Sequence, residues 1–152
     1  MDCTHAIAAS GAAFLIAVLW FDLMFDVQCR GHFGDVLPAE VLSSISAYYR
    51  RVTIEAWPMN RLIALVMLTT LLAVVVEIGR HADRWWIELA ALATVASAIG
   101  VARARTVPNA MRLGRAMDTL EVQSRLARAI YRDHLYCLAA IVILLTLQLT
   151  SR

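Results

Sequence analysis

The chain alternates long apolar runs with short polar segments. Each of four runs is close to the ~20 residues that an α-helix needs to cross the hydrocarbon core of a bilayer. Trp20, Trp85 and Trp86 stand at the ends of these runs, as is typical of the membrane–water interface. The pattern predicts an all-α, membrane-spanning four-helix bundle. Its helices should cover about residues 5–28, 59–79, 84–104 and 119–150.

A shorter segment between the first two runs has a different pattern. In residues 38–56, apolar residues recur at helical spacing on one side, whereas Glu40 and Arg50 fall on the other. The Trp57-Pro58 pair should end this helix, because the residue before a proline avoids the α region. The segment is too short and too polar to span. We therefore expect an amphipathic helix that lies on the membrane surface or packs over the mouth of the bundle.

The other two connectors carry turn signals. Residues 81–84 form a tight polar turn between the second and third runs. Residues 103–117 are basic and contain Pro108 and Gly114, both of which interrupt helices. The sequence therefore predicts that the third helix ends near Ala104 and that a connector follows it.

The last helix should be unusually long. Asp118 and Glu121 have the spacing of a capping box, and no Pro or Gly follows before Leu149. A helix of that length exceeds the ~30 Å hydrocarbon thickness, so its first half should project into water. That half could bind anionic lipid headgroups, or it could be a solvated face in which Glu121 pairs with Arg125. The basic stripe in question is Arg125, Arg128 and Arg132.

Composition supports a membrane protein of one domain. The chain is 61% hydrophobic and 17% charged, against about 45–50% and about 25% in a globular domain. Its 152 residues suit a single integral membrane domain over 1–152. A net charge of +2 does not indicate nucleic acid as a partner. Cys3, Cys29 and Cys137 are odd in number and widely spaced, so we expect no disulfide framework. The start of the chain lacks the basic region of a signal peptide, so we keep the first run as a helix.

The arginines predict an orientation. All basic residues are arginines, and all except Arg80, Arg84 and Arg152 lie at or near the first and third connectors. Segments rich in arginine stay in the cytoplasm. We therefore expect a multi-pass protein of a bacterial cytoplasmic membrane with both termini in the periplasm. Its expected partners are the lipid bilayer and, for lateral contacts, a second copy or a larger membrane complex.

This topology brings one polar cluster together at the cytoplasmic mouth. Asp22 and Asp26 share a helix face with small residues, so they should point into the bundle. They could exchange protons or hold a metal with His134. Alternatively, each acid is neutralised by an arginine of the first or third connector. The expected cluster is Asp22, Asp26, Tyr48, Tyr49, Asn60, Arg61, Asn109, Arg132, Asp133 and His134, with the two tyrosines read most simply as interfacial anchors.

A second polar cluster is expected at the outer mouth. Glu77 and His81 are one helical turn apart, and Glu88 follows across the turn. Carboxylate and imidazole groups can hold a divalent metal. The spacing matches no known metal signature, however, and the preferred interpretation is interfacial ion pairing that also involves His5 and Arg84.

Two segments carry a family resemblance. VPNAMRL follows the third apolar run, and the polar stretch SRLARAIYRDH leads into the last one. In these segments the later half resembles small four-helix bacterial integral membrane proteins, among them the anthrone-oxygenase-like family. The resemblance implies oxygenation of hydrophobic aromatic substrates. The Trp and Asn of that family are not matched between Arg125 and His134, and no catalytic residue is carried over.

No catalytic motif or nucleotide-binding loop occurs in the chain, and the sequence leaves any cofactor unknown. The preferred hypothesis is an accessory or structural membrane subunit rather than an enzyme. The alternative is an oxygenase-like membrane enzyme, or a proton- or ion-handling protein, centred on Asp22 and Asp26. In either case we expect the arginine stripe to lie beside the amphipathic helix, so that both cap the acidic mouth.

Overall fold

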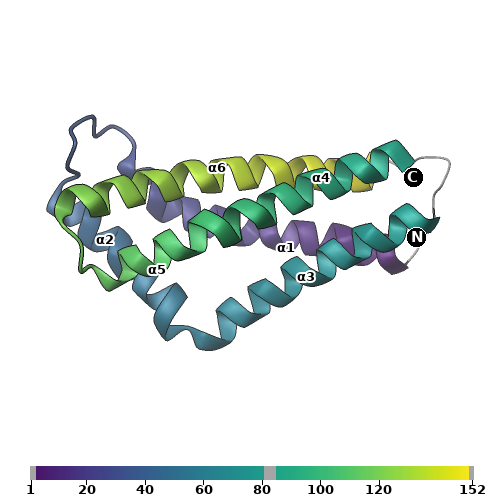
Figure 1. The fold of residues 1–152 in the computed structure, drawn as a ribbon, viewed down its shortest axis with the longest axis horizontal. Helices are drawn as coiled ribbons and strands as arrows, with labels where there is room; N and C mark the ends of the chain where they lie inside the picture. The colour runs from purple at the N-terminus through teal and green to yellow at the C-terminus, as the bar shows by residue number, and fades with distance from the viewer. Residues whose placement is uncertain (1–2, 81–84, 151–152) are drawn as a thin grey trace.

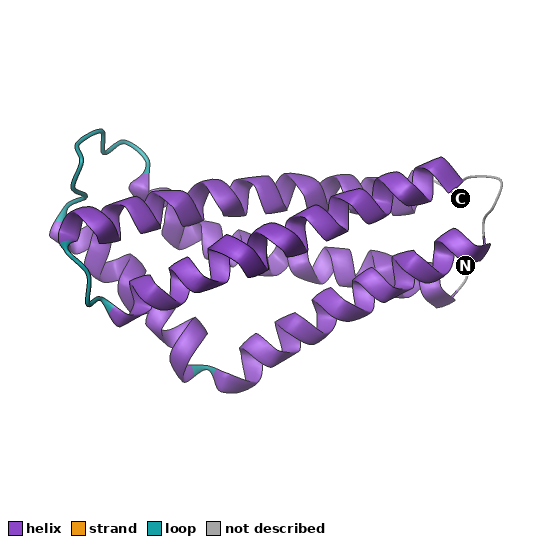
Figure 2. Cartoon of the chain, in the orientation of Figure 1, coloured by secondary structure: helices purple, strands orange, loops and turns teal. Residues whose placement is uncertain are grey.

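The computed structural model describes residues 3–80 and 85–150, and within those ranges it is helical with no strand. Four long helices form an antiparallel bundle (Figures 1 and 2). The apolar helices are those of a multi-pass membrane protein, because each is long and apolar enough to cross a bilayer. The predicted fold class is confirmed. The bundle helices are α1 (Cys3–Asp26), α3 (Trp57–Arg80), α4 (Trp85–Val101) and α6 (Leu120–Thr150).

The four helices form a ring in which each contacts two neighbours. α1 packs against α3 and α6, and α4 packs against the same two helices. Small and branched residues fill the centre, including Ala12, Val74 and Leu144. Large apolar side chains point outward, as lipid-facing side chains do. On α3 this outward row is Leu62, Leu65, Leu68 and Leu72.

A close approach joins α1 to α3. A Cβ added to Gly11 would lie 2.0 Å from Thr70 Oγ1, so a larger residue would force the Thr70 side chain to move. Ala8, Leu15 and Asp26 are buried on the same side of α1. The prediction that the acidic face of α1 points into the bundle is therefore confirmed.

The amphipathic segment caps one end of the bundle. α2 (Ala39–Arg50) continues into a π-helical turn, η2 (Arg51–Glu55). In Figure 1, α2 lies at one end of the bundle and the two chain termini lie at the other. We call these two ends of the bundle the α2 end and the terminal end. The apolar side of α2 forms a second core with α5 (Val107–Arg115) and α6. Of the two predicted positions, α2 therefore takes the one over the mouth of the bundle. The break before α3 falls at Ala56, one residue earlier than predicted.

The third helix does not end near Ala104 as predicted. α4 passes through a π-helical segment, η4 (Ala102–Thr106), directly into α5. Pro108 lies in the first turn of α5, where its missing N–H is tolerated. The wider π turn before it accommodates the interruption of the helical hydrogen bonds. The span therefore reaches Arg115, and the left-handed Ala116 ends it.

Gly114 acts as a packing residue rather than a stop. A Cβ on Gly114 would lie 2.7 Å from the backbone nitrogen of Arg50. The α2 and α5 backbones therefore touch here, which fixes α2 across the bundle end. The predicted turn at 81–84 lies outside the described residues.

The start of α6 differs in detail from the predicted capping box. Thr119 is the capping residue, since its Oγ1 accepts from the backbone N–H of Val122 at 3.4 Å. Asp118 instead accepts two hydrogen bonds from the Arg112 guanidinium, at 2.7 Å each. This ion pair lowers the pKa of Asp118. No ion pair joins Glu121 to Arg125 in the described ranges.

Candidate functional site

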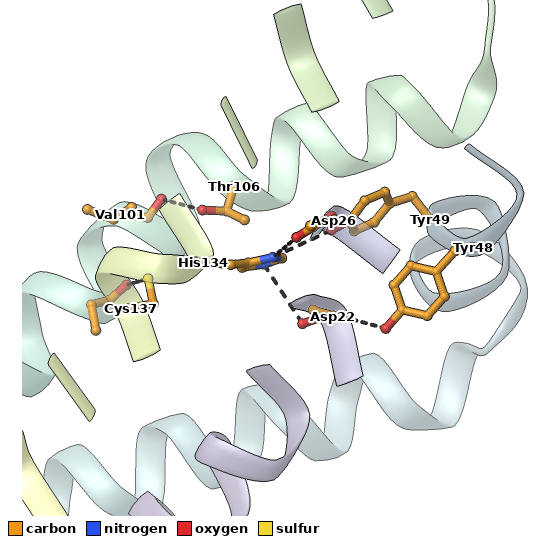
Figure 3. A network of polar contacts seen from close by, with 9 residues as sticks. Asp22, Asp26, Tyr48, Tyr49, Val101, Thr106, His134 and Cys137 are labelled. Atoms are coloured by element: carbon orange, nitrogen blue, oxygen red, sulfur yellow. Dashed lines mark hydrogen bonds and ion pairs between the residues drawn. The ribbon is translucent and has the colours of Figure 1, made fainter. Parts of the chain in front are cut away.

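A buried polar network occupies the α2 end of the bundle (Figure 3). Asp22 and Asp26 come from the last turns of α1 and lie one turn apart on its inner face. α2 contributes Tyr48 and Tyr49, and α6 contributes His134. Residues more than 100 positions apart in sequence therefore meet at one point.

His134 lies between the two carboxylates. Its Nδ1 is 2.6 Å from Oδ2 of Asp26, which is a short hydrogen bond to a charged group. Its Nε2 is 3.8 Å from Oδ2 of Asp22. The imidazole thus bridges the two acids in the view of Figure 3, with the closer contact on the more deeply buried one.

Each acid also accepts a phenolic hydrogen bond from α2. The hydroxyl of Tyr48 donates to Asp22 at 2.5 Å, and that of Tyr49 donates to Asp26 at 2.6 Å. Burial and the neighbouring carboxylates raise the pKa of both tyrosines well above the usual value. The phenols therefore remain protonated and act as fixed donors. Tyr48 is held further by stacking on Phe25, with ring centroids 4.0 Å apart.

These contacts determine the tautomer of His134. An ionised Asp26 can only accept, at either oxygen, so Nδ1 carries the proton in its bond to this carboxylate. Nε2 is then the nitrogen that can gain or lose a proton, and it faces Asp22. A carboxylate that orients a histidine through Nδ1 is the arrangement that prepares the other nitrogen for proton transfer.

Burial differs across the network and indicates how protons could enter it. The Asp26 side chain is 0% exposed and that of His134 is 8% exposed, whereas Asp22 retains 18%. Asp22 is therefore the least buried of these three residues. A proton could reach Nε2 through Asp22, whereas Asp26 has no direct contact with water.

The expectation that arginines neutralise these acids is wrong. In residues 3–80 and 85–150, neither Asp22 nor Asp26 has an ion pair with an arginine. Arg105 instead pairs with the buried Asp133 at 3.1 Å. The tyrosines of α2 and the imidazole of His134 already bond both carboxylates, so the acids need no arginine to satisfy them.

Other members of the expected inner cluster lie elsewhere. Asn60 is exposed and donates to the backbone oxygen of Thr53 at 3.1 Å. Arg61 stacks over Trp57, with its guanidinium carbon 4.1 Å from the ring centroid. Arg132 is exposed and Asn109 is half-buried, and neither is hydrogen-bonded to the network.

Sequence reasoning assigned Tyr48 and Tyr49 mainly to interfacial anchoring, and their role as donors was missed. The available signal was their position on the apolar side of α2. If α2 packs over the mouth, tyrosines on that side must point at the acids. A buried phenol also requires a hydrogen-bond partner.

A smaller cluster lies at the terminal end. His5 Nδ1 is 3.4 Å from Oε1 of Glu77. The side chains of Glu77 and Glu88 are both buried. His81 and Arg84, the other expected members, lie outside the described residues. In the described part of the chain, no group of three or more His, Cys, Asp or Glu residues is arranged to hold a metal ion.

The arginine stripe and the cysteines have separate surroundings. Arg128 donates to the backbone oxygens of His32, Gly34 and Asp35, so it holds the loop before α2 rather than α2 itself. The prediction that the stripe lies beside the amphipathic helix is therefore wrong for Arg128, and Arg125 and Arg132 line a groove with the same loop. Three free thiols are present, and Cys137 donates to the Ala98 oxygen at 3.6 Å (Figure 3).

Compared with known proteins, the chain matches no family model, no curated protein and no solved structure.

Proposed function

We propose that this chain is a membrane protein that binds and releases protons at one end of its helix bundle. The observation that carries the proposal is the placement of His134 between Asp22 and Asp26. A histidine changes charge near neutral pH unless its surroundings prevent it. Two carboxylates inside the bundle that pair with no arginine of residues 3–80 and 85–150 are costly in a membrane protein, and such groups commonly serve a function.

Each residue has a distinct part in the proposed exchange. Asp22 passes a proton between solvent and Nε2 of His134, because its side chain is less buried than those of Asp26 and His134. Asp26 stabilises the imidazolium through Nδ1. Tyr48 and Tyr49 hold the carboxylates in position without titrating themselves.

The orientation is part of the proposal. The α2 end carries most of the arginines, and both termini lie at the other end (Figure 1). By the positive-inside rule, the network would face the cytoplasm of a bacterium, and the termini would face the periplasm.

The accessory-subunit hypothesis has one observation in its favour. The network links α1, α2 and α6, so it could serve only to lock the cap onto the bundle. A second copy or another membrane protein would then be the functional partner. An oxygenase-like role, implied by the sequence resemblance, would use the same acids and His134.

Infrared difference spectroscopy of the protein in lipid nanodiscs tests the proposal. Spectra recorded at acidic and neutral pH should contain imidazole bands from protonation of His134, and His134→Gln should remove them. Asp133→Asn is the matched control, because Asp133 is also buried but pairs with Arg105. If wild type and His134→Gln give the same difference spectrum and both fold, the network does not exchange protons and the accessory role is favoured.

A further inference from the structure

A basic groove of about 790 Å³ lies at the α2 end, beside the polar network. One wall is the loop that follows α1, and the other is the first half of α6. These segments run side by side in Figure 1. The arginines that line the groove are Arg30, Arg112, Arg125, Arg128 and Arg132.

The positive charge of the groove is largely uncompensated. No carboxylate is among its lining residues. Asp118 neutralises Arg112, but Arg30, Arg125 and Arg132 have no ion pair within the described ranges. Arginines gathered without acids create a field that attracts anions.

Arg128 gives the groove a defined shape. Its guanidinium donates to three backbone oxygens of the loop, including those of His32 and Asp35. These acceptors are neutral, so the charge of Arg128 remains available to a ligand. The loop is thereby held against α6 as a wall of the groove.

Apolar side chains line the same groove. Phe33 is 99% exposed, which is exceptional for a phenylalanine in a folded chain. Leu126 and Val122 of α6 also contribute to the lining. A small soluble anion would leave these apolar surfaces in water, whereas an anionic amphiphile would cover them.

The position of the groove fits the membrane surface. Its residues 29 and 132 are close in sequence to Asp26 and His134, where the apolar parts of α1 and α6 end. Interfacial aromatic and basic residues are typical of this depth. We propose that the groove binds the phosphodiester headgroup of an anionic phospholipid, with Phe33 against its glycerol and upper acyl region.

Lipid retention measured by native mass spectrometry tests this proposal. Wild-type protein is released from mixed micelles that contain equal amounts of phosphatidylglycerol and phosphatidylcholine. Each arginine near an anionic lipid contributes ~1 kcal/mol, which is about fivefold in affinity. Arg125→Gln/Arg132→Gln should therefore lower phosphatidylglycerol retention roughly 30-fold. Arg51→Gln/Arg103→Gln is the matched control, because both arginines are exposed at the same end but outside the groove.

Three results would overturn the proposal. Wild type could retain both lipids equally, or the two double variants could lose retention equally, which would indicate unspecific attraction. Alternatively, inorganic phosphate at a concentration matching the lipid could displace phosphatidylglycerol, which would assign the groove to a soluble anion. Phe33→Ala should lower retention several-fold without changing the thermal stability, because its side chain has no packing contact to lose.

Discussion

Replacing Asp26 by asparagine separates the structural role of the network from its proton chemistry. Both oxygens of Asp26 accept hydrogen bonds, one from Tyr49 and one from His134, each at 2.6 Å. Asparagine has the same size but only one acceptor oxygen, and its amide donates. The remaining oxygen can still accept from Tyr49. The amide can donate to Nδ1 only if His134 moves its proton to Nε2.

The expected loss of stability is moderate. All partners remain bonded, and only the charge assistance is lost. Hydrogen bonds to charged groups contribute ~1.5–3 kcal/mol and neutral ones ~0.5–1.5 kcal/mol, so the two bonds together should lose about 2 kcal/mol. In a chain of this size that lowers the melting temperature by roughly 4–8 °C. Asp26→Ala should cost more, because it leaves the Tyr49 hydroxyl and the imidazole buried without an acceptor.

Two assays check this prediction. Thermal unfolding followed by circular dichroism should rank wild type above Asp26→Asn and Asp26→Ala last. The ¹⁵N chemical shifts of His134, assigned from their loss in His134→Gln, should change from the Nδ1–H to the Nε2–H tautomer in Asp26→Asn. If Asp26→Asn has the same melting temperature as Asp26→Ala, or if its His134 retains the Nδ1–H tautomer, the assigned hydrogen bonds are wrong.

Three further predictions concern the cap, its tyrosines and the topology. Gly114→Ala should cost ~1–3 kcal/mol of unfolding free energy, because its Cβ would lie 2.7 Å from the α2 backbone. Gly100→Ala is the control, because its Cβ would meet nothing within 4 Å, and equal melting temperatures of the two variants would refute the contact. Folding raises the pKa of Tyr48 and Tyr49, so their contribution to stability is complete below pH ~10 and lost as the pH rises further. A titration of tyrosinate absorbance should thus show a phase at high pH that coincides with unfolding and is absent from the Tyr48→Phe/Tyr49→Phe variant. If this phase occurs while the protein is still folded, the buried hydrogen bonds of the two tyrosines are contradicted. Because Cys29 is buried, topology is tested in a variant that lacks Cys29 and Cys137: Cys3 should react from the periplasm and Phe33→Cys from the cytoplasm, and the reverse would overturn the orientation.

The bundle could be predicted because its determinants are local. An apolar run of sufficient length specifies a spanning helix whatever its neighbours are. The inward direction of Asp22 and Asp26 followed from the small residues on the same face of α1. The helix that continues past Pro108 could not be predicted, since it depends on a π turn that the surrounding packing stabilises.

The partners of the acids depended on tertiary structure. The sequence places arginines, tyrosines and a histidine at the same end, and charge alone favours arginine. Whether the tyrosines reach the carboxylates depends on where α2 lies, and α2 is held by its apolar core with α5 and α6 and by the close contact at Gly114. Tyr49 and His134 are buried beside Asp26, so the phenol and the imidazole are its hydrogen-bond partners.

The pH dependence of the His134 imidazole tests the central claim most directly. The measurement is the ¹⁵N spectrum of histidine-labelled wild-type protein in lipid bilayers, recorded from pH ~5 to ~8. We predict a reversible change of His134 between the neutral Nδ1–H form and the doubly protonated imidazolium. The change should be slowed in Asp22→Asn, because Asp22 is less buried than Asp26 and supplies the proton. A His134 signal that keeps one neutral tautomer across the whole range would show that the network is a structural lock and would contradict the account.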